Sequence, residues 1–470
     1  MSDPALLSLE ETAAAIREGR LTSVEATEAC LSRIEAYEGT VNSFISLDRT
    51  AALEAARKAD ADIAKGEIRG PLHGVPLAHK DMYYRKGHTT TCGSTIRRNY
   101  VPDVTATVLE KLEDAGALHI GGLNMSEFAA GPTGHNEHFG NCHNPWNPDH
   151  VTGGSSSGSG AATAARFVYG ALGSDTGGSI RLPAALCGVV GLKPTYGRIS
   201  RYGSMPRAWS VDTMGPLTRT VRDCAMMTGA IAGLDPNDST TLDEPVPDYL
   251  AAIDAGVKDL RVAVPKNFFY DTVEDSVREV LEASVEALRE LDIQVVEVEI
   301  PDLRPLFRLG DAISKSEAAT IHAKWMRQRP QDYGRHTAAR VEAGFHLPAT
   351  RYIEALSLRG KYMTEFCAAA FAEADMLHCP VIPMPVPTIE ETDFHGNDTV
   401  ADMVAKMTMF TRPFNYLGLP SLAVPCGFTE GNLPVSFQLV GRPFGEHQLF
   451  AMGAAYQGAT EWHERVPDLT

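Results

Sequence analysis

The N-terminal part of the chain has the apolar and polar pattern of helices. Residues 8–11 and 22–25 are both S/T-x-x-E capping boxes, and each opens a segment rich in alanine and leucine. Apolar positions recur at helical spacing over residues 24–37. A further helix is predicted over residues 51–65. It leads through a turn containing proline and glycine to a short apolar strand at residues 75–78.

The second half of the chain alternates strand-like and helical patterns. Residues 260–264 are apolar and extended, an apolar stripe at helical spacing follows over 277–291, and residues 293–298 are again extended. This β-α-β order is typical of an α/β sandwich. The stretch over about 304–371 is largely helical, and we expect it to form a cap over a site.

These patterns divide the chain into three predicted parts. Residues 1–70 form an N-terminal helical segment, and residues 71–235 form a core that holds the candidate chemistry. Residues 236–470 complete the α/β core and include the cap. A polar, proline-containing stretch over 235–247 marks the second boundary. A chain of 470 residues is long enough to bury a large core without disulfides or metal ions.

Charge and cysteine usage narrow the classes of partner. The formal net charge of −18 opposes binding to nucleic acid and to anionic membrane surfaces. No run reaches the ~18 apolar residues of a membrane helix, and the N-terminus lacks a secretory pattern. The eight scattered cysteines include no C-x-x-C pair, which is typical of reduced thiols. We therefore expect a cytoplasmic protein with no nucleic-acid or membrane partner.

A glycine- and serine-rich segment over residues 152–160 is followed by a second Gly-Gly-Ser within residues 173–181. Such runs are often flexible linkers, although linkers rarely lead into an apolar helix as this one does. Residues 154–158 also fit the G-x-S-x-G nucleophile elbow with Ser156 in the middle, but no histidine has a distinguishing context. Dinucleotide-binding and P-loop patterns fit less well, because each lacks a required residue.

Lys80 suggests a third hypothesis for the chemistry of these serines. A serine hydroxyl needs a base, and a lysine serves as one only when burial lowers its pKa until it is neutral. Lys80 follows the apolar strand at residues 75–78, where partial removal from water is expected. The neighbouring Asp81 offers the alternative of an ordinary salt-bridged lysine.

Together the motifs resemble those of the amidase signature family of serine hydrolases. The resemblance covers nearly the whole chain and implies an α/β fold, a mixed-sheet α/β/α sandwich with a helical cap region. Its most specific part is Asp-Thr-Gly-Gly-Ser with an upstream Gly-Gly-Ser-Ser and a lysine. The matching segments are GVPLAHKD at 74–81, LNMSEF at 123–128, GGSS at 153–156, GSDTGGSIR at 173–181, CGVVGLKPT at 187–195 and GLPSLAVP at 418–425.

The resemblance implies a Ser–Ser–Lys triad. Ser179 would be the acylated nucleophile, and Lys80 would be the base. Ser155 would be the bridging serine, which the family holds through a cis peptide bond. The neighbouring serines are interpreted as structural or helix-capping, namely Ser156, Ser157 and Ser159.

The segment around the expected nucleophile would also stabilise charge. Backbone N–H groups can converge on a developing oxyanion, and glycines allow a close approach. Asp175 and Arg181 would support this loop by pairing with each other, with a surface ion pair as the alternative. The expected oxyanion donors are the N–H groups of Thr176, Gly177, Gly178 and Ser179.

No metal or other cofactor is implied by the resemblance. The histidines and the cysteine between residues 135 and 150 match no common zinc spacing, and they are interpreted as polar loop residues. Large apolar side chains are candidates for a substrate pocket. These candidates are Met125, Phe128, Trp209 and Phe414.

One branch of the family acts as the glutaminase subunit of tRNA-dependent amidotransferases, where an arginine and an aspartate hold the charged end of glutamine. Arg340 matches that arginine, but the aspartate position falls on Thr408. This departure removes an anchor for the α-amino group and argues against glutamine.

The sequence therefore predicts an amidohydrolase that cleaves a small carboxylic amide, with aryl amides and anilides as candidates, through an acyl-enzyme on Ser179. Carbamates, hydrazides and esters are alternatives within the same chemistry. A glutaminase-type subunit of an amidotransferase complex is an alternative of another class. The expected partner is a small-molecule amide, and the assembly considered is a homodimer.

Overall fold

The computed structural model describes residues 3–393 and 400–469, and within them one large mixed sheet forms the centre of the molecule. Its eleven strands follow the order β1-β3-β2-β6-β8-β7-β12-β13-β11-β9-β10, and β4 and β5 form a separate pair. The strands are β1 Phe44–Leu47, β2 Pro76–Lys80, β3 Leu118–Leu123, β4 His143–Asn144, β5 Asn147–Val151, β6 Gly170–Asp175, β7 Val190–Lys193, β8 Thr213–Thr218, β9 Arg261–Pro265, β10 Gln294–Val298, β11 Met376–Pro380, β12 Ser421–Phe428 and β13 Pro434–Gly441.

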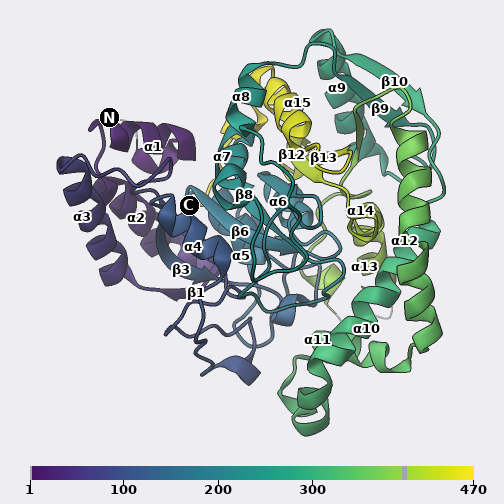
Figure 1. The fold of residues 1–470 in the computed structure, drawn as a ribbon, viewed down its shortest axis with the longest axis horizontal. Helices are drawn as coiled ribbons and strands as arrows, with labels where there is room; N and C mark the ends of the chain where they lie inside the picture. The colour runs from purple at the N-terminus through teal and green to yellow at the C-terminus, as the bar shows by residue number, and fades with distance from the viewer. Residues whose placement is uncertain (1–2, 394–399, 470) are drawn as a thin grey trace.

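Helices pack against this sheet and extend beyond it (Figure 1). The N-terminal helices α1 to α3 lie together at one end of the molecule, and α10 to α12 lie at the opposite side (Figure 1). The helices are α1 Leu9–Arg17, α2 Ser23–Val41, α3 Arg49–Ala64, α4 Thr107–Asp114, α5 Ser157–Ala164, α6 Arg181–Cys187, α7 Val221–Ile231, α8 Tyr249–Asp254, α9 Asp275–Glu290, α10 Arg304–Gln328, α11 Arg335–Glu342, α12 Ala349–Ala370, α13 Val400–Thr408, α14 Arg412–Leu417 and α15 Glu446–Gly458.

The sheet is parallel near its two ends and antiparallel between them. Strand β2 pairs in parallel with β3 and β6, and β9 pairs in parallel with β10 and β11. The strands from β6 through β13 to β11 pair antiparallel. The β-α-β unit predicted between residues 260 and 298 is confirmed as β9, α9 and β10, and the mixed-sheet α/β fold is confirmed.

Local sequence signals set the N-terminal helices. Both predicted capping boxes form, with the Ser8 and Thr22 hydroxyls each accepting from the third backbone N–H of their helices. Helix α2 runs longer than predicted and ends at Asn42, whose φ of 53° is left-handed. None of the described helices is long and apolar enough to cross a membrane.

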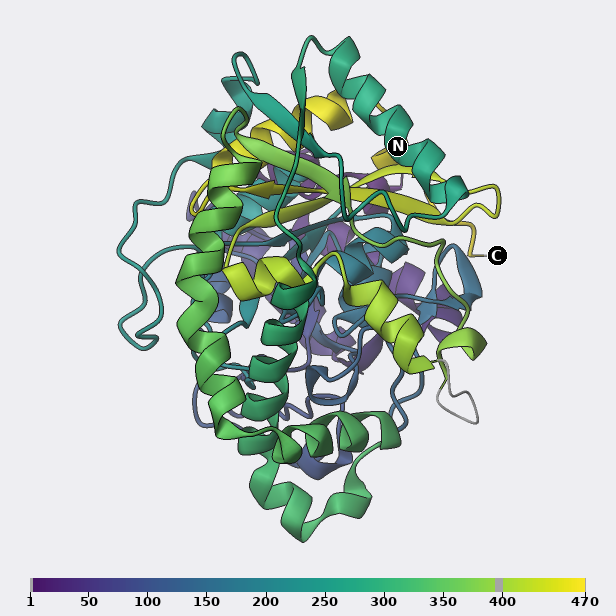
Figure 2. The same ribbon diagram turned by 90° about the vertical axis from the view of Figure 1, so that its right-hand side faces the viewer.

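The predicted cap consists of helices α10, α11 and α12. Figure 2 shows α10 and α12 side by side along one flank of the sheet. The cap is tied to the core by Phe128, whose ring packs against Trp325 of α10 at 5.4 Å and against Tyr333 at 5.8 Å. A buried carboxylate adds a polar tie, because Glu127 accepts from the N–H of Gly334 at 2.9 Å.

Candidate active site

Lys80 ends strand β2 inside the protein. All five residues of the strand are buried, and Lys80 is 1% exposed. Its Nζ lies 2.7 Å from Oγ of Ser155, 3.0 Å from Oγ of Ser156 and 2.9 Å from Oγ of Ser174. The structure thus brings Lys80 and Ser155 together, and it adds Ser174 of β6, which was not singled out from the sequence.

Burial dominates the electrostatics of this lysine. It lowers the pKa of Lys80 to about 7, although the nearby Asp212 and Asp175 carboxylates oppose the change. The three side-chain oxygens that contact Nζ belong to hydroxyls, which supply no negative charge to hold a proton there. About half of the lysine side chains are therefore neutral near pH 7.

The salt bridge considered between Lys80 and Asp81 does not form. The Asp81 carboxylate accepts hydrogen bonds from the backbone N–H and the hydroxyl of Thr91 instead. Burial raises the pKa of Asp81 to about 6. The hypothesis of an ordinary salt-bridged lysine is wrong at this position.

The glycine-rich segment holds Ser155 against Lys80. The peptide bond between Gly154 and Ser155 is cis. A Cβ atom at Gly154 would lie 2.6 Å from the carbonyl oxygen of Gly131, so only glycine fits this close approach. The N–H of Ser156 donates to the carbonyl oxygen of Ser179 at 3.3 Å, which joins the segment to the loop that follows β6.

Ser156 differs from its interpretation as a structural or helix-capping serine. It precedes α5, but its side chain makes no capping hydrogen bond. Its hydroxyl contacts Nζ of Lys80 and accepts from the N–H of Ser174 at 3.2 Å. Within residues 3–393 and 400–469, no histidine contacts this hydroxyl, so the nucleophile-elbow hypothesis lacks a base.

Asp175 and Arg181 pair in the interior. Both side chains are 0% exposed, with Nε to Oδ2 and Nη2 to Oδ1 distances of 3.1 Å. Arg181 also donates to Asn415 and to Gln438. Burial opposes the charge on Asp175, yet Arg181 holds the pKa of this carboxyl below its usual range. The alternative of a surface ion pair is wrong.

Replacing Asp175 by asparagine is expected to lower the free energy of unfolding by about 3–5 kcal/mol, because it leaves a buried guanidinium without its counter-charge. Urea denaturation measures the change. The matched control is Asp254→Asn, which removes a carboxylate that is 66% exposed and paired with Arg222. The control is expected to cost less than about 1 kcal/mol. Equal losses in the two variants would contradict the structural role of the buried pair.

The expected oxyanion donors divide into two groups. The N–H of Gly178 donates to Oδ1 of Asp175 at 2.7 Å, so this group shapes the loop and does not face a substrate carbonyl. That is a correction to the expected set. The N–H groups of Thr176, Gly177 and Ser179 make no hydrogen bond to another residue in the described parts of the chain.

A small polar cavity lies beside Ser179. Its volume is about 40 Å³, and Ser179 itself is 9% exposed. Most of the side chains that line it are polar or cationic, and they come from the loop after β6, the segment before β8 and the cap. The polar and cationic residues in the lining are Thr176, Ser179, Arg207, Ser314, Arg340, Thr408 and Arg412.

Three guanidinium groups give this cavity a positive charge. Arg412 pairs with Asp311 at 2.6 Å, and Arg207 donates to the carbonyl oxygen of Ser314 at 3.2 Å. Nε of Arg340 is buried without a hydrogen-bond partner among the described residues. Burial, reinforced by the charges of Arg412 and Arg207, lowers the pKa of Arg340 to about 10. The arrangement favours an anionic group beside Ser179.

The predicted apolar pocket is not found at this cavity, since none of its four candidates lines it. Met125 and Phe128 are buried in core contacts, and Phe128 faces the cap. Phe414 belongs to an aromatic cluster with Phe269 and is 0% exposed. Trp209 is 44% exposed on the surface. Apolar side chains give no sequence signal that separates a core position from a pocket position.

The cavity contains arginines that were not identified from the sequence. Arg207 and Arg412 lie in segments about 200 residues apart, so no spacing relates them. Arg340 and Thr408, considered together at the sequence level, do line the same cavity. No group of three or more histidine, cysteine, aspartate or glutamate residues in the described chain is arranged to hold a metal ion.

Comparisons with known proteins place the whole chain in one family. The family described as Amidase matches residues 25–450. The chain is 39% identical to a glutamyl-tRNA(Gln) amidotransferase subunit from Roseiflexus sp. (strain RS-1), over 98% of each chain. A solved structure of the identically named subunit from Thermotoga maritima has a TM-score of 0.81 and 34% identity, over 97% of this chain and 95% of that one.

A second solved structure belongs to a vestigial protein complex that reveals the origins of an s-triazine catabolic enzyme. It has a TM-score of 0.89 and 32% identity, over 96% of this chain and 98% of that chain. The prediction of a lone enzyme or homodimer with only a small-molecule partner is wrong, because full-length relatives are amidotransferase subunits. The chain belongs to the amidase family and is an amide hydrolase.

Proposed function

We propose that this chain is the amide-hydrolysing subunit of a multi-subunit complex and that its substrate is an amide carrying a carboxylate group. The relatives named as amidotransferase subunits support the first part. One observation carries the second part: Arg207, Arg340 and Arg412 line the same cavity as Ser179. A bound carboxylate there would hold the scissile carbonyl beside the serine.

Acylation begins at the Ser179 hydroxyl. Neutral Lys80 accepts a proton from Ser155, which accepts one from Ser179 as its Oγ bonds to the carbonyl carbon. The carbonyl oxygen becomes an oxyanion, and the N–H groups of Thr176, Gly177 and Ser179 are placed to donate to it. The 2.7 Å contact between Lys80 and Ser155 is the proton-transfer link that supports this role.

The second half of the reaction returns the proton. Protonated Lys80 passes a proton through Ser155 to the leaving nitrogen as the C–N bond breaks, which releases ammonia or an amine. Water then attacks the acyl group on Ser179 and gives its proton to the same lysine. Collapse of the second intermediate breaks the ester bond, frees the carboxylate and reprotonates Ser179.

The charge of the cavity distinguishes between substrates that carry an ammonium group and those that do not. Three arginines face one carboxylate, Asp311, which is already paired with Arg412. Thr408 supplies a hydroxyl where an acid would be needed to neutralise an α-ammonium group. We therefore infer that a carboxylate-bearing amide without an amino group binds better than glutamine does.

Glutaramate and glutamine form a matched pair for this test, because they differ only in the α-ammonium group. The purified chain is expected to release ammonia from glutaramate with a kcat/KM at least about tenfold higher, the effect of one unpaired charge of ~1.4 kcal/mol or more. An equal or higher kcat/KM for glutamine would contradict the inferred substrate class.

Arg340→Met is expected to raise the KM for glutaramate by about 10- to 100-fold, because a charge-assisted hydrogen bond is worth ~1.5–3 kcal/mol. Hydrolysis of pentanamide, which replaces the carboxylate by a methyl group, should change little. The control variant is Arg327→Met on the exposed face of α10. The same KM increase with both substrates would show that Arg340 does not bind the carboxylate.

The proposed role as a subunit has its own test in the rate of the isolated chain. Because a partner would complete the active complex, the chain alone is expected to turn over far more slowly than the ~10 s⁻¹ typical of enzymes. A rate near that value without any partner would contradict it. The eight cysteines are free thiols, which supports the expected reducing, cytoplasmic setting.

A further inference from the structure

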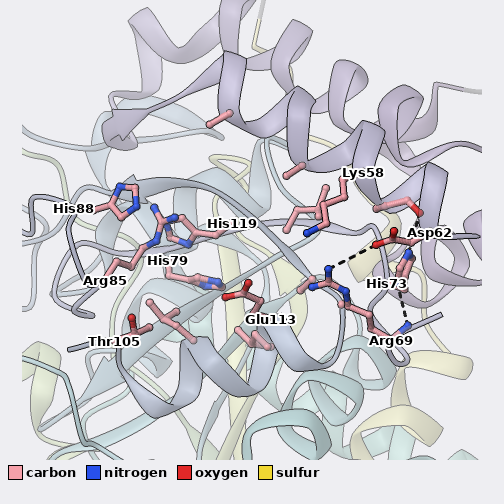
Figure 3. A pocket seen from close by; sticks show the side chains of 18 of the residues that line it. Lys58, Asp62, Arg69, His73, His79, Arg85, His88, Thr105, Glu113 and His119 are labelled. Atoms are coloured by element: carbon pink, nitrogen blue, oxygen red, sulfur yellow. Dashed lines mark hydrogen bonds and ion pairs between the residues drawn. The ribbon is translucent and has the colours of Figure 1, made fainter. Parts of the chain in front are cut away.

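A larger cavity lies away from the triad, on the N-terminal side of the sheet. Its volume is about 400 Å³, and helices α3 and α4, strand β3 and the segment after β2 contribute to its lining. His79 lines it, whereas the next residue, Lys80, contacts the serines (Figure 3). Successive strand residues point to opposite faces, so the cavity lies behind the strand that ends in Lys80.

Cationic and imidazole groups gather at one end of this cavity. Figure 3 shows Arg85 close to His79, His88 and His119, with the pair formed by Asp62 and Arg69 at the other end. No hydrogen bond or ion pair from the Arg85 guanidinium to another described residue is found. A guanidinium that lines a concave site without a counter-charge is suited to an oxyanion.

The buried histidines add donors without adding charge. Nδ1 of His119 is buried and has no hydrogen-bond partner in the described chain. Nδ1 of His79 accepts from the N–H of Leu172 at 3.1 Å, which leaves its proton on Nε2. Burial, and then the charge of Arg85, lowers the pKa of both imidazoles, so both are neutral.

The charged lining sets the charge of a ligand. Its cations are Lys58, Arg69, Arg85 and Lys86, and its carboxylates are Asp62 and Glu113. The balance is two positive charges, which a phosphate monoester with its charge of about −1.5 to −2 neutralises. Its oxygens would accept from the guanidinium and the imidazoles together. The cavity is also large enough for an organic group attached to the phosphate.

We propose that the cavity behind β2 binds a phosphate-bearing small molecule, with Arg85 as the main contact and His119 as a neutral donor. This site is separate from the arginines beside Ser179, since no residue lines both cavities. The inference does not depend on the proposed function, because it concerns binding and not turnover.

Isothermal titration calorimetry with inorganic phosphate tests the site in the full chain. Arg85→Gln is expected to raise the dissociation constant by at least about tenfold, and His119→Gln by about two- to tenfold. The charge-matched control is Arg57→Gln, an exposed position of α3 outside the cavity lining, which should bind as the wild type does. Arg85 makes no described ion pair, so its loss should leave the circular dichroism spectrum unchanged.

Two further arms test where phosphate binds and which anion the cavity prefers. Arg340→Met should bind phosphate as tightly as the wild type does, whereas a loss confined to that variant would place the ion beside Ser179 and overturn the proposal. Citrate should bind more weakly than phosphate, and tighter citrate binding would assign a carboxylate ligand instead. Unchanged phosphate binding in both Arg85→Gln and His119→Gln would also overturn it.

Discussion

Ser179→Ala is expected to lower kcat for amide hydrolysis by about 10⁴- to 10⁶-fold, the range found when a nucleophilic serine is removed from a catalytic triad. The variant loses the atom that forms the acyl bond, while the cavity and its arginines stay in place. Ammonia release from glutaramate measures the change. Ser179 is 9% exposed and lines the cavity, so removal of its hydroxyl should leave the fold intact.

Two serine variants of the glycine-rich segment are informative controls. Ser157→Ala removes a buried hydroxyl that donates to the carbonyl oxygen of Asn124 and does not contact Lys80, so its rate should stay near that of the wild type. Ser156→Ala should cost less than Ser179→Ala. A larger loss in Ser156→Ala than in Ser179→Ala would revive the nucleophile elbow and contradict the assignment of Ser179.

Lys80→Met is expected to reduce kcat/KM by about 10²- to 10⁴-fold, the usual contribution of a positioned general base. Methionine fills similar space and needs no counter-charge, so the change removes the base with little effect on packing. Lys193 provides a matched control. It is also fully buried, its pKa is also lowered to about 7 by burial, and it contacts the carbonyl oxygen of Pro194. Lys193→Met should retain most of the activity.

The same lysine predicts how the rate depends on pH. Burial lowers the pKa of Lys80 to about 7, and only the neutral amine accepts a proton. The rate constant kcat/KM should therefore rise with pH and level off above about pH 8, with roughly a tenth of the maximum at pH 6. Lys193→Met should keep this profile and Lys80→Met should lose it. A profile that stays flat between pH 6 and 8 would contradict Lys80 as the base.

Local sequence signals predicted much of the fold. The capping boxes at Ser8 and Thr22 depend only on residues three positions apart, and both form. The parallel pair β9 and β10 follows from an apolar strand, an amphipathic helix and a second strand in sequence. The order of the whole sheet was not predictable in this way, because its register depends on contacts between residues far apart in the chain.

The candidate site was predictable only where a motif carries it. Lys80 and Ser155 were found through their motifs, and their side chains lie 2.7 Å apart. Ser174 was not found, because its contact with Lys80 depends on the parallel pairing of β2 with β6. The cationic cavity was missed because an arginine that faces a substrate has no local pattern that separates it from one on the surface.

The N–H of Gly178 shows a limit of another kind. The motif places four consecutive N–H groups near the expected nucleophile, but it does not show which of them the protein itself uses. The buried carboxylate of Asp175 takes the N–H of Gly178, and Arg181 fixes that carboxylate in place. A donor set can be counted only when the partners of each N–H group are known.

Covalent labelling tests the central claim most directly, because it needs neither the natural substrate nor a partner protein. The purified chain is treated with phenylmethanesulfonyl fluoride, and peptide mapping by mass spectrometry locates the sulfonyl group. The proposed triad predicts one label, on Ser179, that forms much more slowly in Lys80→Met and at the wild-type rate in Lys193→Met. A label on Ser156, or labelling of Ser179 that is independent of Lys80, would contradict it.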